Sequence, residues 1–225
     1  MLIVYNGVLE MGSKERRERE RDEVRNRILD AARELFATFG YDGVSMRKIA
    51  EKIEYSPTTI YQYFKDKDAL VRDLCYADFG KLAEVFREML QIADPIESLR
   101  QCGESYVRFA VAYPNHYRLM FMTPLPVTHD PAERAEIKGN PETDAYALVR
   151  HLVEIAAKSG VLRDPQADLE LVTQTLWAGL HGVVALQIAM ECNDWLPWRP
   201  LELRTTAMVD ALCNGLFVKE ESCRR

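Results

Sequence analysis

Apolar and polar positions follow the period of a helix from Ser45 onward. Ser45 stands at the start of the pattern, where its hydroxyl can accept a hydrogen bond from a free backbone N–H. The apolar positions then recur at i, i+3, i+4 and i+7, which places them on one helical face. They are Met46, Ile49, Ala50 and Ile53. The pattern predicts a short helix that begins at Ser45 and ends near Ile53.

A second helix start follows 11 residues further along the chain. Ser56 is again a good N-cap, and Pro57 takes the first helical position, where proline loses no hydrogen bond. Ile60 and Phe64 then lie on one face of this second helix. Two starts this close together leave room for only a short helix and a turn. The spacing predicts a helix-turn-helix, a motif whose second helix enters the major groove of DNA.

The outward face of the second helix carries groups that suit DNA. Thr58, Thr59 and Gln62 lie opposite the apolar face, and Tyr61 and Tyr63 flank them. Threonine and tyrosine hydroxyls can reach phosphates, and glutamine can pair bidentately with adenine. The alternative is an ordinary helical hairpin with a solvated polar face. The agreement of caps, periodicity and side-chain composition favours the DNA-reading helix.

The segments GYDGVSMRKIA (40–50) and SPTTIYQYFKDKDAL (56–70) resemble the N-terminal domain of TetR-family repressors, over about residues 22–74. The resemblance implies an all-α fold, a homodimer, and a C-terminal domain whose ligand abolishes operator binding. It also implies a base contact for Arg47 and phosphate contacts for Tyr61 and Lys67. The residues that we expect at the DNA are Ser45, Arg47, Lys48, Pro57, Thr58, Thr59, Tyr61, Gln62, Tyr63 and Lys67.

The turn between the two helices departs from the family pattern. Family members often have Ala-Gly-Val before the second N-cap, where this chain has Ile53, Glu54 and Tyr55. Loss of the glycine predicts either a costlier left-handed residue in the turn or a different turn geometry. Glu54 also places an acidic group near the DNA.

The net charge of −6 for the whole chain argues against a nucleic-acid partner, but this charge is unevenly distributed along the sequence. Residues 1–70 carry 13 basic and 13 acidic side chains, whereas residues 71–225 carry 16 and 22. The excess acid therefore lies outside the predicted reader, and a local basic surface is sufficient for DNA binding.

Residues 14–27 form a run of mixed charge that allows two interpretations. It is either a solvated extension of the first helix, with opposite charges at i, i+4 spacing, or a basic arm that reaches a DNA groove. The interleaved glutamates favour the solvated extension. The helix proper has one apolar face and ends at Gly40. The apolar face comprises Ile28, Ala32, Leu35, Phe36 and Phe39.

The remainder of the chain reads as helix, without persistent strand alternation. Proline and glycine residues separate the helices and predict a loop at 123–140. We expect helices over 67–91, 95–113, 115–122, 141–159, 166–192 and 201–218. The fold class predicted is all-α, with an N-terminal extension (1–21), a helix-turn-helix DNA-binding domain (22–70) and an effector-binding and dimerisation domain (71–225).

The last two predicted helices have too little polar surface for a monomer. The segment LVTQTLWAGLHGVVALQIAM (171–190) is apolar nearly all round, which implies burial on several sides. Two such helices in each subunit predict a four-helix homodimer interface. The two-fold axis would present two reader helices to half-sites ~34–36 Å apart. The alternative is a wholly intramolecular core.

Aromatic and methionine side chains gather in the C-terminal region and predict a small-molecule pocket. TLWAGLHGVVAL resembles the Trp-x-x-x-His-Gly segment of one TetR C-terminal subgroup, here called WHG-like. The alternative is that these residues are core packing. The aromatic content favours an aromatic effector, neutral to mildly cationic. The candidate pocket residues are Phe86, Tyr106, Phe109, Tyr117, Met120, Phe121, Tyr146, Trp177 and His181.

Other function classes find little support. Ser45-x-x-Lys48 has the spacing of a serine acylase, but its companion motifs are absent, as are a phosphate-binding loop, HExxH and GxSxG. The histidines form no metal-ligand spacing. The five cysteines form no CxxC pair, which indicates reduced cytoplasmic thiols, with a redox-sensing pair as the alternative. We find neither a secretory signal nor an apolar run of the ~18 residues that a membrane span needs. The sequence predicts a cytoplasmic, ligand-responsive DNA-binding regulator without cofactor or metal. It acts as a repressor, or alternatively as an activator or an effector-independent architectural DNA-binding protein.

Overall fold

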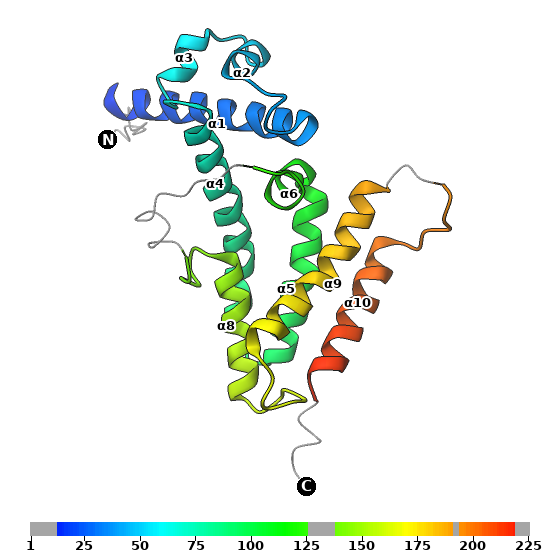
Figure 1. Cartoon of the computed structure of the whole chain (residues 1–225). Coiled ribbons are helices and arrows are strands. Elements are labelled where there is room, and N and C mark those ends of the chain that lie inside the picture. The colour runs from blue at the N-terminus through cyan, green and yellow to red at the C-terminus, as the bar shows by residue number, and fades with distance from the viewer. Residues whose placement is uncertain (1–12, 126–137, 191–193, 219–225) are drawn as a thin grey trace, which may run out of the picture. The chain divides into compact units, whose positions relative to one another are not determined.

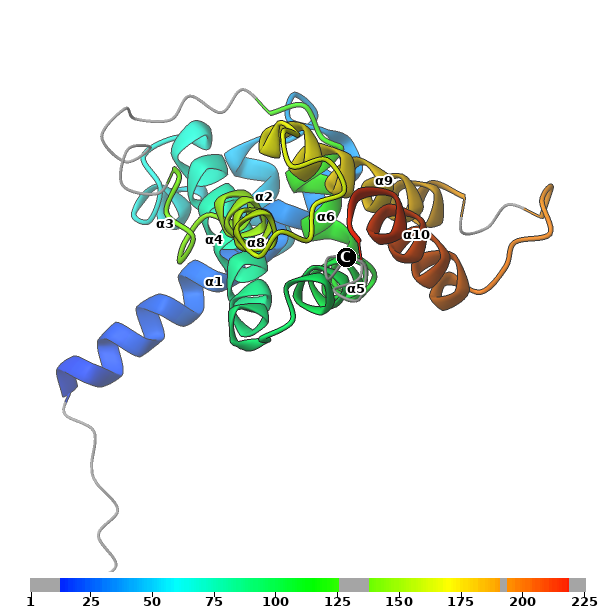
Figure 2. The ribbon, with the colours of Figure 1, turned by 90° about the horizontal axis from the view of Figure 1, so that it is seen from below.

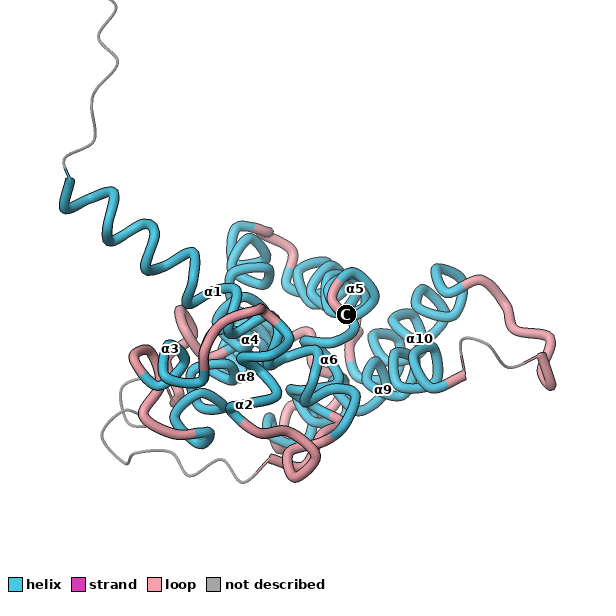
Figure 3. The backbone as a smooth tube through the Cα atoms, turned by 90° about the horizontal axis from the view of Figure 1, so that it is seen from above, coloured by secondary structure: helices cyan, strands magenta, loops and turns pink. Residues whose placement is uncertain are grey.

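The computed structural model describes residues 13–125, 138–190 and 194–218. These residues form helices joined by turns and loops, with an isolated antiparallel bridge between Leu162 and Phe217 (Figure 3). The all-α prediction is confirmed. The chain divides into two compact units. The described part of the first comprises residues 13–71 and 123–125, and the second comprises the other described residues from Arg72 onward.

The first unit holds three helices and the start of a fourth. These are α1 (Ser13–Phe39), α2 (Met46–Lys52), α3 (Pro57–Tyr61) and the first turn of α4 (Lys67–Arg87). Helix α2 packs against both α1 and α3 (Figure 1). The side chains between them are apolar and fully or almost fully buried, which fixes α3 on its neighbours. They include Ile28, Ala32, Phe36, Ile49, Ile60, Phe64 and Leu70.

Helix α1 begins at Ser13, so it already includes the end of the predicted N-terminal extension. Its mixed-charge part is exposed and carries i, i+4 ion pairs, which confirms that this run is helical. The pairs are Lys14–Glu18, Arg16–Glu20 and Arg19–Glu23, with N–O distances of 3.9, 3.6 and 3.5 Å.

The C-terminal turn of α1 departs from its predicted apolar face. Phe39 was expected inward, but its side chain is 52% exposed. The helix ends at Phe39 itself, and the next residue, Gly40, has a φ of +68° in the left-handed region that glycine tolerates. Phe39 therefore lies at the rim of the unit, and the Lys48 ammonium covers its ring at 3.5 Å.

The second unit is built around α5. It comprises the rest of α4, the 3-10 turn η1 (Glu88–Gln91), α5 (Pro95–Ala112), α6 (Pro114–Phe121), α8 (Ala145–Lys158), α9 (Leu169–Ala189) and α10 (Leu201–Leu216). Helix α5 contacts α6, α8, α9 and α10, and α9 lies beside α10 (Figure 2). Cys75, Cys102 and Cys213 are buried as free thiols, as predicted for them, while Cys192 and Cys223 lie outside the described residues.

Several helix ends differ from the prediction because side chains cap the backbone inside the expected range. Helix α8 begins at Ala145 and not at 141, since Asp144 accepts hydrogen bonds from the backbone N–H groups of Tyr146 and Ala147. Asp168 caps α9 in the same way, which moves its start from 166 to Leu169. Most of the predicted loop at 123–140 and the predicted end of the helix 166–192 fall on the stretches 126–137 and 191–193, which lie outside the described residues.

Three other helix ends also differ. The long helix from Lys67 gives way to a 3-10 turn at Glu88, so Met89 is buried and the expected Leu90 only half-buried. Helix α6 begins at Pro114 and not at 115, so this proline both follows the end of α5 and starts α6. Helix α10 ends at Leu216, because Phe217 is extended and pairs with Leu162.

Within the single chain, helix α9 is buried on one side, and the burial on several sides that was expected with a dimer partner stays a prediction. Its buried positions are Val172, Thr173, Leu176, Leu180, Val183 and Val184. Leu171 and Leu186 on the same helix are 63% and 51% exposed. By length and composition α9 is also the one described helix that could cross a membrane, a test that the core helix of a soluble protein passes as well.

Candidate nucleic-acid interface and ligand pocket

The two helices of the helix-turn-helix begin as their caps predict. Ser45 Oγ accepts a hydrogen bond from the backbone N–H of Lys48 at 3.2 Å. Ser56 Oγ accepts one from the N–H of Thr59 at 3.1 Å, and Pro57 occupies the first turn of α3. Both serines thus hold helix starts, and Ser56 Oγ also lies 2.9 Å from Thr59 Oγ1.

The turn between α2 and α3 contains a left-handed residue, which is the first of the two alternatives predicted from the missing glycine. Glu54 has φ +60° and is the one non-glycine residue with positive φ in the described part of the chain. A side chain in this conformation is strained because its Cβ approaches the following carbonyl oxygen. The acidic side chain of Glu54 is exposed.

The outward residues of α3 are accessible. Pro57, Thr58 and Gln62 are exposed, and Tyr61 is 54% exposed. Thr59 and Tyr63 are half-buried beside them. Tyrosine, threonine and glutamine are therefore presented on one open surface, where they have the chemistry to contact phosphates and base edges.

The three basic residues expected at the DNA, Arg47, Lys48 and Lys67, differ in how firmly contacts within the protein hold their side chains. Arg47 is exposed and pairs with Glu51, Nε to Oε1, at 2.9 Å. The Lys48 ammonium donates to the Gly43 carbonyl at 3.3 Å, in addition to covering Phe39. Lys67 is the most tightly held, because its Nζ donates to the carbonyls of Tyr41 and Val44, both at 3.0 Å. Its ammonium also lies 3.7 Å from the centre of the Tyr41 ring. Lys67 thus ties the start of α4 to the loop before α2.

Two arginines that the sequence analysis did not single out lie beside the reader. A shallow groove is lined by Arg17, Glu20, Arg21, Val24, Gln62 and Tyr63. The Arg21 guanidinium lies 5.9 Å from the Tyr63 ring centre. Neither Arg17 nor Arg21 forms an ion pair within the described residues, unlike Lys14, Arg16 and Arg19. In the sequence, the i, i+4 spacing of these two arginines indicates that they share one face of the helix.

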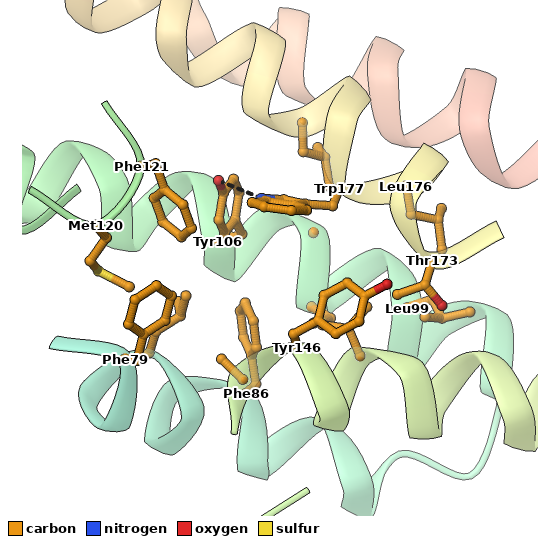
Figure 4. A pocket seen from close by; sticks show the side chains of 16 residues that line it. Phe79, Phe86, Leu99, Tyr106, Met120, Phe121, Tyr146, Thr173, Leu176 and Trp177 are labelled. Atoms are coloured by element: carbon orange, nitrogen blue, oxygen red, sulfur yellow. Dashed lines mark hydrogen bonds between the residues drawn. The ribbon is translucent and has the colours of Figure 1, made fainter. Parts of the chain in front are cut away.

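The second unit contains a cavity of about 220 Å³ between α4, α5, α6, α8 and α9 (Figure 4). Its lining is almost entirely apolar and aromatic. The lining residues are Phe79, Leu82, Phe86, Leu99, Cys102, Gly103, Tyr106, Met120, Phe121, Ala145, Tyr146, Val149, Thr173, Leu176, Trp177 and Leu180.

Six of the nine candidate pocket residues line this cavity. They are Phe86, Tyr106, Met120, Phe121, Tyr146 and Trp177. Phe109, Tyr117 and His181 do not line it, and this corrects the expectation for those three residues. Phe109 is buried against Tyr113 and His116, with ring centroids 5.3 and 6.3 Å away. The lining residues that were not predicted are mostly aliphatic. Sequence periodicity does not distinguish an aliphatic residue that lines a pocket from one that packs in the core.

Tyr117 and His181 lie behind the cavity wall, where they complete a hydrogen-bonded chain. Trp177 Nε1 donates to the Tyr106 hydroxyl at 3.1 Å, a contact drawn in Figure 4. The Tyr106 hydroxyl donates to the Tyr117 hydroxyl at 3.2 Å, and Tyr117 lies 2.5 Å from His181 Nδ1. His181 Nδ1 is thus within hydrogen-bonding distance of both tyrosine hydroxyls, since the Tyr106 hydroxyl lies 3.3 Å from it.

Burial keeps this chain neutral. It raises the pKa of Tyr106 to about 12 and raises the pKa of Tyr117 further. Burial also lowers the pKa of His181, so its imidazole is uncharged at neutral pH. The four side chains thus connect the cavity wall on α5 and α9 to α6 through hydrogen bonds. None of the four is ionised.

Helix α6 also has a polar contact with α4. His116 Nδ1 lies 3.0 Å from an oxygen of Asp78, a carboxylate that is 1% exposed. The Lys81 ammonium on α4 lies 3.6 Å from the Tyr113 ring centre, just before α6. The described residues contain no cluster of three or more possible metal ligands.

Two family models match the chain, one in each unit. The model of bacterial regulatory proteins of the tetR family matches residues 28–74. The model of the tetracyclin repressor-like C-terminal domain matches residues 99–212, which is just over half of the chain.

Curated relatives share the N-terminal part. The HTH-type transcriptional regulator UidR of Escherichia coli (strain K12) is 36% identical over 72 residues, which are 32% of this chain and 37% of UidR. The HTH-type transcriptional repressor AcnR of Corynebacterium jeikeium is 38% identical over 58 residues, or 26% of this chain and 31% of AcnR. The matches thus span about a third of the length of either relative.

Solved structures share the fold over most of the chain. A TetR family transcription regulator from Marinobacter aquaeolei has a TM-score of 0.71 at 19% identity, covering 89% of this chain and 100% of that chain. The fatty acid degradation regulator FadR from Bacillus halodurans has a TM-score of 0.67 at 20% identity, covering 91% and 96%. At these identities the likeness concerns the fold alone.

Proposed function

Because this chain belongs to the TetR family of bacterial regulatory proteins, we propose that it is a ligand-responsive transcriptional repressor. In this proposal a homodimer binds a palindromic operator, and a small-molecule effector releases it. The observation that carries the proposal is the exposed polar face of α3, Thr58, Tyr61 and Gln62, on a capped helix-turn-helix. The curated relatives are likewise named as regulators and repressors, and no enzyme is among the relatives cited.

Each unit has its own part in this proposal. Residues 22–70 bind DNA through the ten candidate residues of the first unit, with 1–21 as the extension that leads into α1. Arg17 and Arg21 add positive charge beside Gln62 and Tyr63, and we place them at DNA phosphates. Residues 71–225 hold the effector and the dimer contact. The protein acts in the cytoplasm, without cofactor or metal.

The Trp-x-x-x-His-Gly segment supports a place in the WHG-like subgroup. Trp177 and His181 are both within hydrogen-bonding distance of the Tyr106 hydroxyl, at 3.1 and 3.3 Å. Gly182 has open space where a Cβ would stand. The three defining residues thus have different places: Trp177 lines the cavity, His181 lies beside the Tyr106 hydroxyl, and Gly182 leaves space on the face of α9.

Helices α9 and α10 supply the proposed dimer surface. The outward side of α9 carries Leu171, Ala178, Gly182 and Leu186, and that of α10 carries Leu203, Ala207 and Ala211. Leu171, Leu186 and Leu203 are each more than half exposed. Small residues between such leucines let two helix pairs approach closely, and burial of the apolar area stabilises the association.

Release depends on α4. This helix carries Phe79, Leu82 and Phe86 in the cavity lining, and its first turn carries the Lys67 that binds the Tyr41 and Val44 carbonyls. Helix α6 contributes Met120 and Phe121 to the same cavity and His116 to the contact with α4. An effector that fits a shifted arrangement of α6 and α4 would move the reader helices off their half-sites. It can do so only through its different affinity for the two states.

The experiment is a gel shift on the DNA immediately upstream of the protein's own gene, across a salt series. A repressor of its own gene binds a short palindrome there tightly, and its affinity falls with salt. A preference no greater than for random DNA would refute regulation of the adjacent gene. An effector-independent architectural protein would bind without release by any small molecule, and the cavity favours the ligand-responsive repressor over it.

Matched arginine variants test the surface beside α3. Arg21→Gln removes one unpaired charge from each subunit, so the slope of log affinity against log salt concentration should fall by about 1.8 for the dimer. Arg19→Gln removes the same charge from a side chain paired with Glu23 and should leave the slope nearly unchanged. Equal slopes for wild type and Arg21→Gln would remove Arg21 from the DNA contact.

A further inference from the structure

The cavity of the second unit restricts the chemistry of its ligand. Resting on the proposed function, we infer that the effector is an uncharged, largely apolar compound with an aromatic body, which binds without a salt bridge and with few or no hydrogen bonds. Three features carry this inference: the absence of ionised groups from the lining, the internal bonding of its polar atoms, and the arrangement of its rings.

The lining contains no lysine, arginine, histidine, aspartate or glutamate among its sixteen described residues. The titratable groups that it does contain are two tyrosines and Cys102. Burial raises the pKa of the Cys102 thiol to about 12, and Tyr106 is raised to a similar pKa. Tyr146 also has its pKa raised, by burial first and then by its hydrogen bond to Glu170. The wall is therefore neutral throughout the physiological range.

The polar atoms of the lining already have partners in the protein. The Trp177 indole N–H is committed to the Tyr106 hydroxyl, which in turn donates to Tyr117. Thr173 Oγ1 donates to the Leu169 carbonyl at 2.7 Å. The Tyr146 hydroxyl donates to the Glu170 carboxylate at 2.5 Å. A ligand with strong donors or acceptors would lose its bonds to water and find few replacements here.

The rings around the cavity are tilted and do not stack in parallel. Phe121 lies 5.6 Å from Phe79 at 84° and 5.7 Å from Trp177 at 59°. Tyr146 lies 6.2 Å from Trp177 at 66°. Such a wall offers both ring edges and ring faces, which suits an aromatic guest. The volume of about 220 Å³ exceeds the ~150 Å³ of an apolar cavity that binds benzene, so a small aromatic guest has room here.

A cationic ligand is the competing case, because aromatic faces attract ammonium groups. The cavity lining provides no carboxylate to pair with such a charge. A cation would therefore have to leave water for ring faces alone, and burying an unpaired charge is costly. The neutral compound is favoured for this reason.

Three probes of nearly the same shape separate the cases on the full-length protein. They are tert-butylbenzene, phenyltrimethylammonium and benzenesulfonate, which are neutral, cationic and anionic. Trp177 lines the cavity and is 40% exposed, so its fluorescence reports binding. Trp195→Phe with Trp198→Phe leaves Trp177 as the sole tryptophan, since the chain has three. We expect tert-butylbenzene to bind about 10- to 100-fold more tightly than either ion.

Each other result overturns the inference. Binding of phenyltrimethylammonium as tight as that of tert-butylbenzene would make the site an aromatic cage for cations. Preference for benzenesulfonate would require a cationic group that reaches the cavity. Failure of all three to bind would show that the cavity does not admit an aromatic guest of this size.

A pair of variants locates the binding. Val149→Phe puts a ring into the cavity and should weaken tert-butylbenzene binding at least 10-fold. Val111→Phe makes the same change at an exposed position of α5 outside this lining and should leave it unchanged. Unaltered binding by folded Val149→Phe would place the compound elsewhere and overturn the inference. The wild-type probe series decides the ligand class if this variant does not fold.

A gel shift without ligand separates this inference from the proposed function. A protein that binds tert-butylbenzene in the cavity but no DNA would refute the repressor and leave the ligand class standing. A protein that binds its operator but none of the probes would refute the ligand class and leave the repressor standing.

Discussion

At the scale of single residues, Glu54 shows how much a local pattern can predict. The missing glycine in the turn pointed to a left-handed residue, and Glu54 has φ +60°. The N-caps Ser45 and Ser56 were predictable for the same reason, since a cap depends only on its immediate neighbours. Phe39 was not predictable, because its exposure depends on where the rest of the unit ends.

Glu54→Gly should stabilise the protein by about 0.5–1 kcal/mol, because glycine adopts positive φ without a Cβ clash. The measurement is the midpoint of thermal unfolding. Glu54→Gln is the control, since it removes the charge but retains the strained Cβ, and it should leave the midpoint unchanged. Equal stabilisation by both variants would mean that charge, and not backbone conformation, is the source.

At the scale of elements, the helices of the described residues followed from periodicity, whereas their ends followed from caps. Asp144 and Asp168 set the starts of α8 and α9, and both stood in the sequence as recognisable N-cap residues. The candidate pocket was predicted as a set of aromatic residues on several helices. Which of them face the cavity depends on how α5, α6 and α9 are rotated against each other, and sequence periodicity does not fix that rotation.

The hydrogen-bonded chain between α5, α6 and α9 should make stability depend on pH. The pKa of His181 is lowered in the folded protein, so the unfolded chain takes up a proton first as the pH falls below ~6.5. The folded state is therefore fully stabilised above that pH. It loses stability as the pH falls from there through the lowered pKa of His181.

His181→Gln tests this dependence, since glutamine can accept the Tyr117 hydrogen bond but takes up no proton in this range. Unfolding midpoints of the wild type and the variant are compared at pH 7.5 and pH 5.5. The wild type should show the larger drop. A drop of the same size in the variant would assign the pH dependence to other histidines, which both proteins share.

At the scale of the whole molecule, the sequence predicted the class of fold and the TetR-family match of its N-terminal part. The helix-turn-helix was predictable because its residues are contiguous. The cavity was only partly predictable, since its lining comes from residues between Phe79 and Leu180 that meet only in the folded unit. The exposed side of α9 is the clearest feature that a single chain leaves unexplained, and it motivates the proposed dimer.

Leu186→Glu should convert the dimer to a monomer, because it places a charge on the apolar side of α9, where Leu186 is 51% exposed. Analytical ultracentrifugation measures the change in mass. Operator affinity should fall by about 100-fold or more, since the two half-sites are then bound independently. Val111→Glu, an exposed change on α5, should retain the dimer. A dimeric Leu186→Glu protein would place the interface elsewhere.

The shortness of α3 limits how much sequence information one subunit can take from its operator. Five residues from Pro57 to Tyr61 rise about 7.5 Å along the helix axis, and successive base pairs are ~3.4 Å apart. One reader helix thus addresses roughly two base pairs directly, and a pair of them roughly four. A sequence of four base pairs recurs by chance thousands of times in a bacterial genome of ~10⁶ sites. The remaining discrimination must then come from base contacts outside these five residues, as expected for Arg47 and Gln62, from half-site spacing, and from the stiffness and groove width of base pairs that no side chain touches.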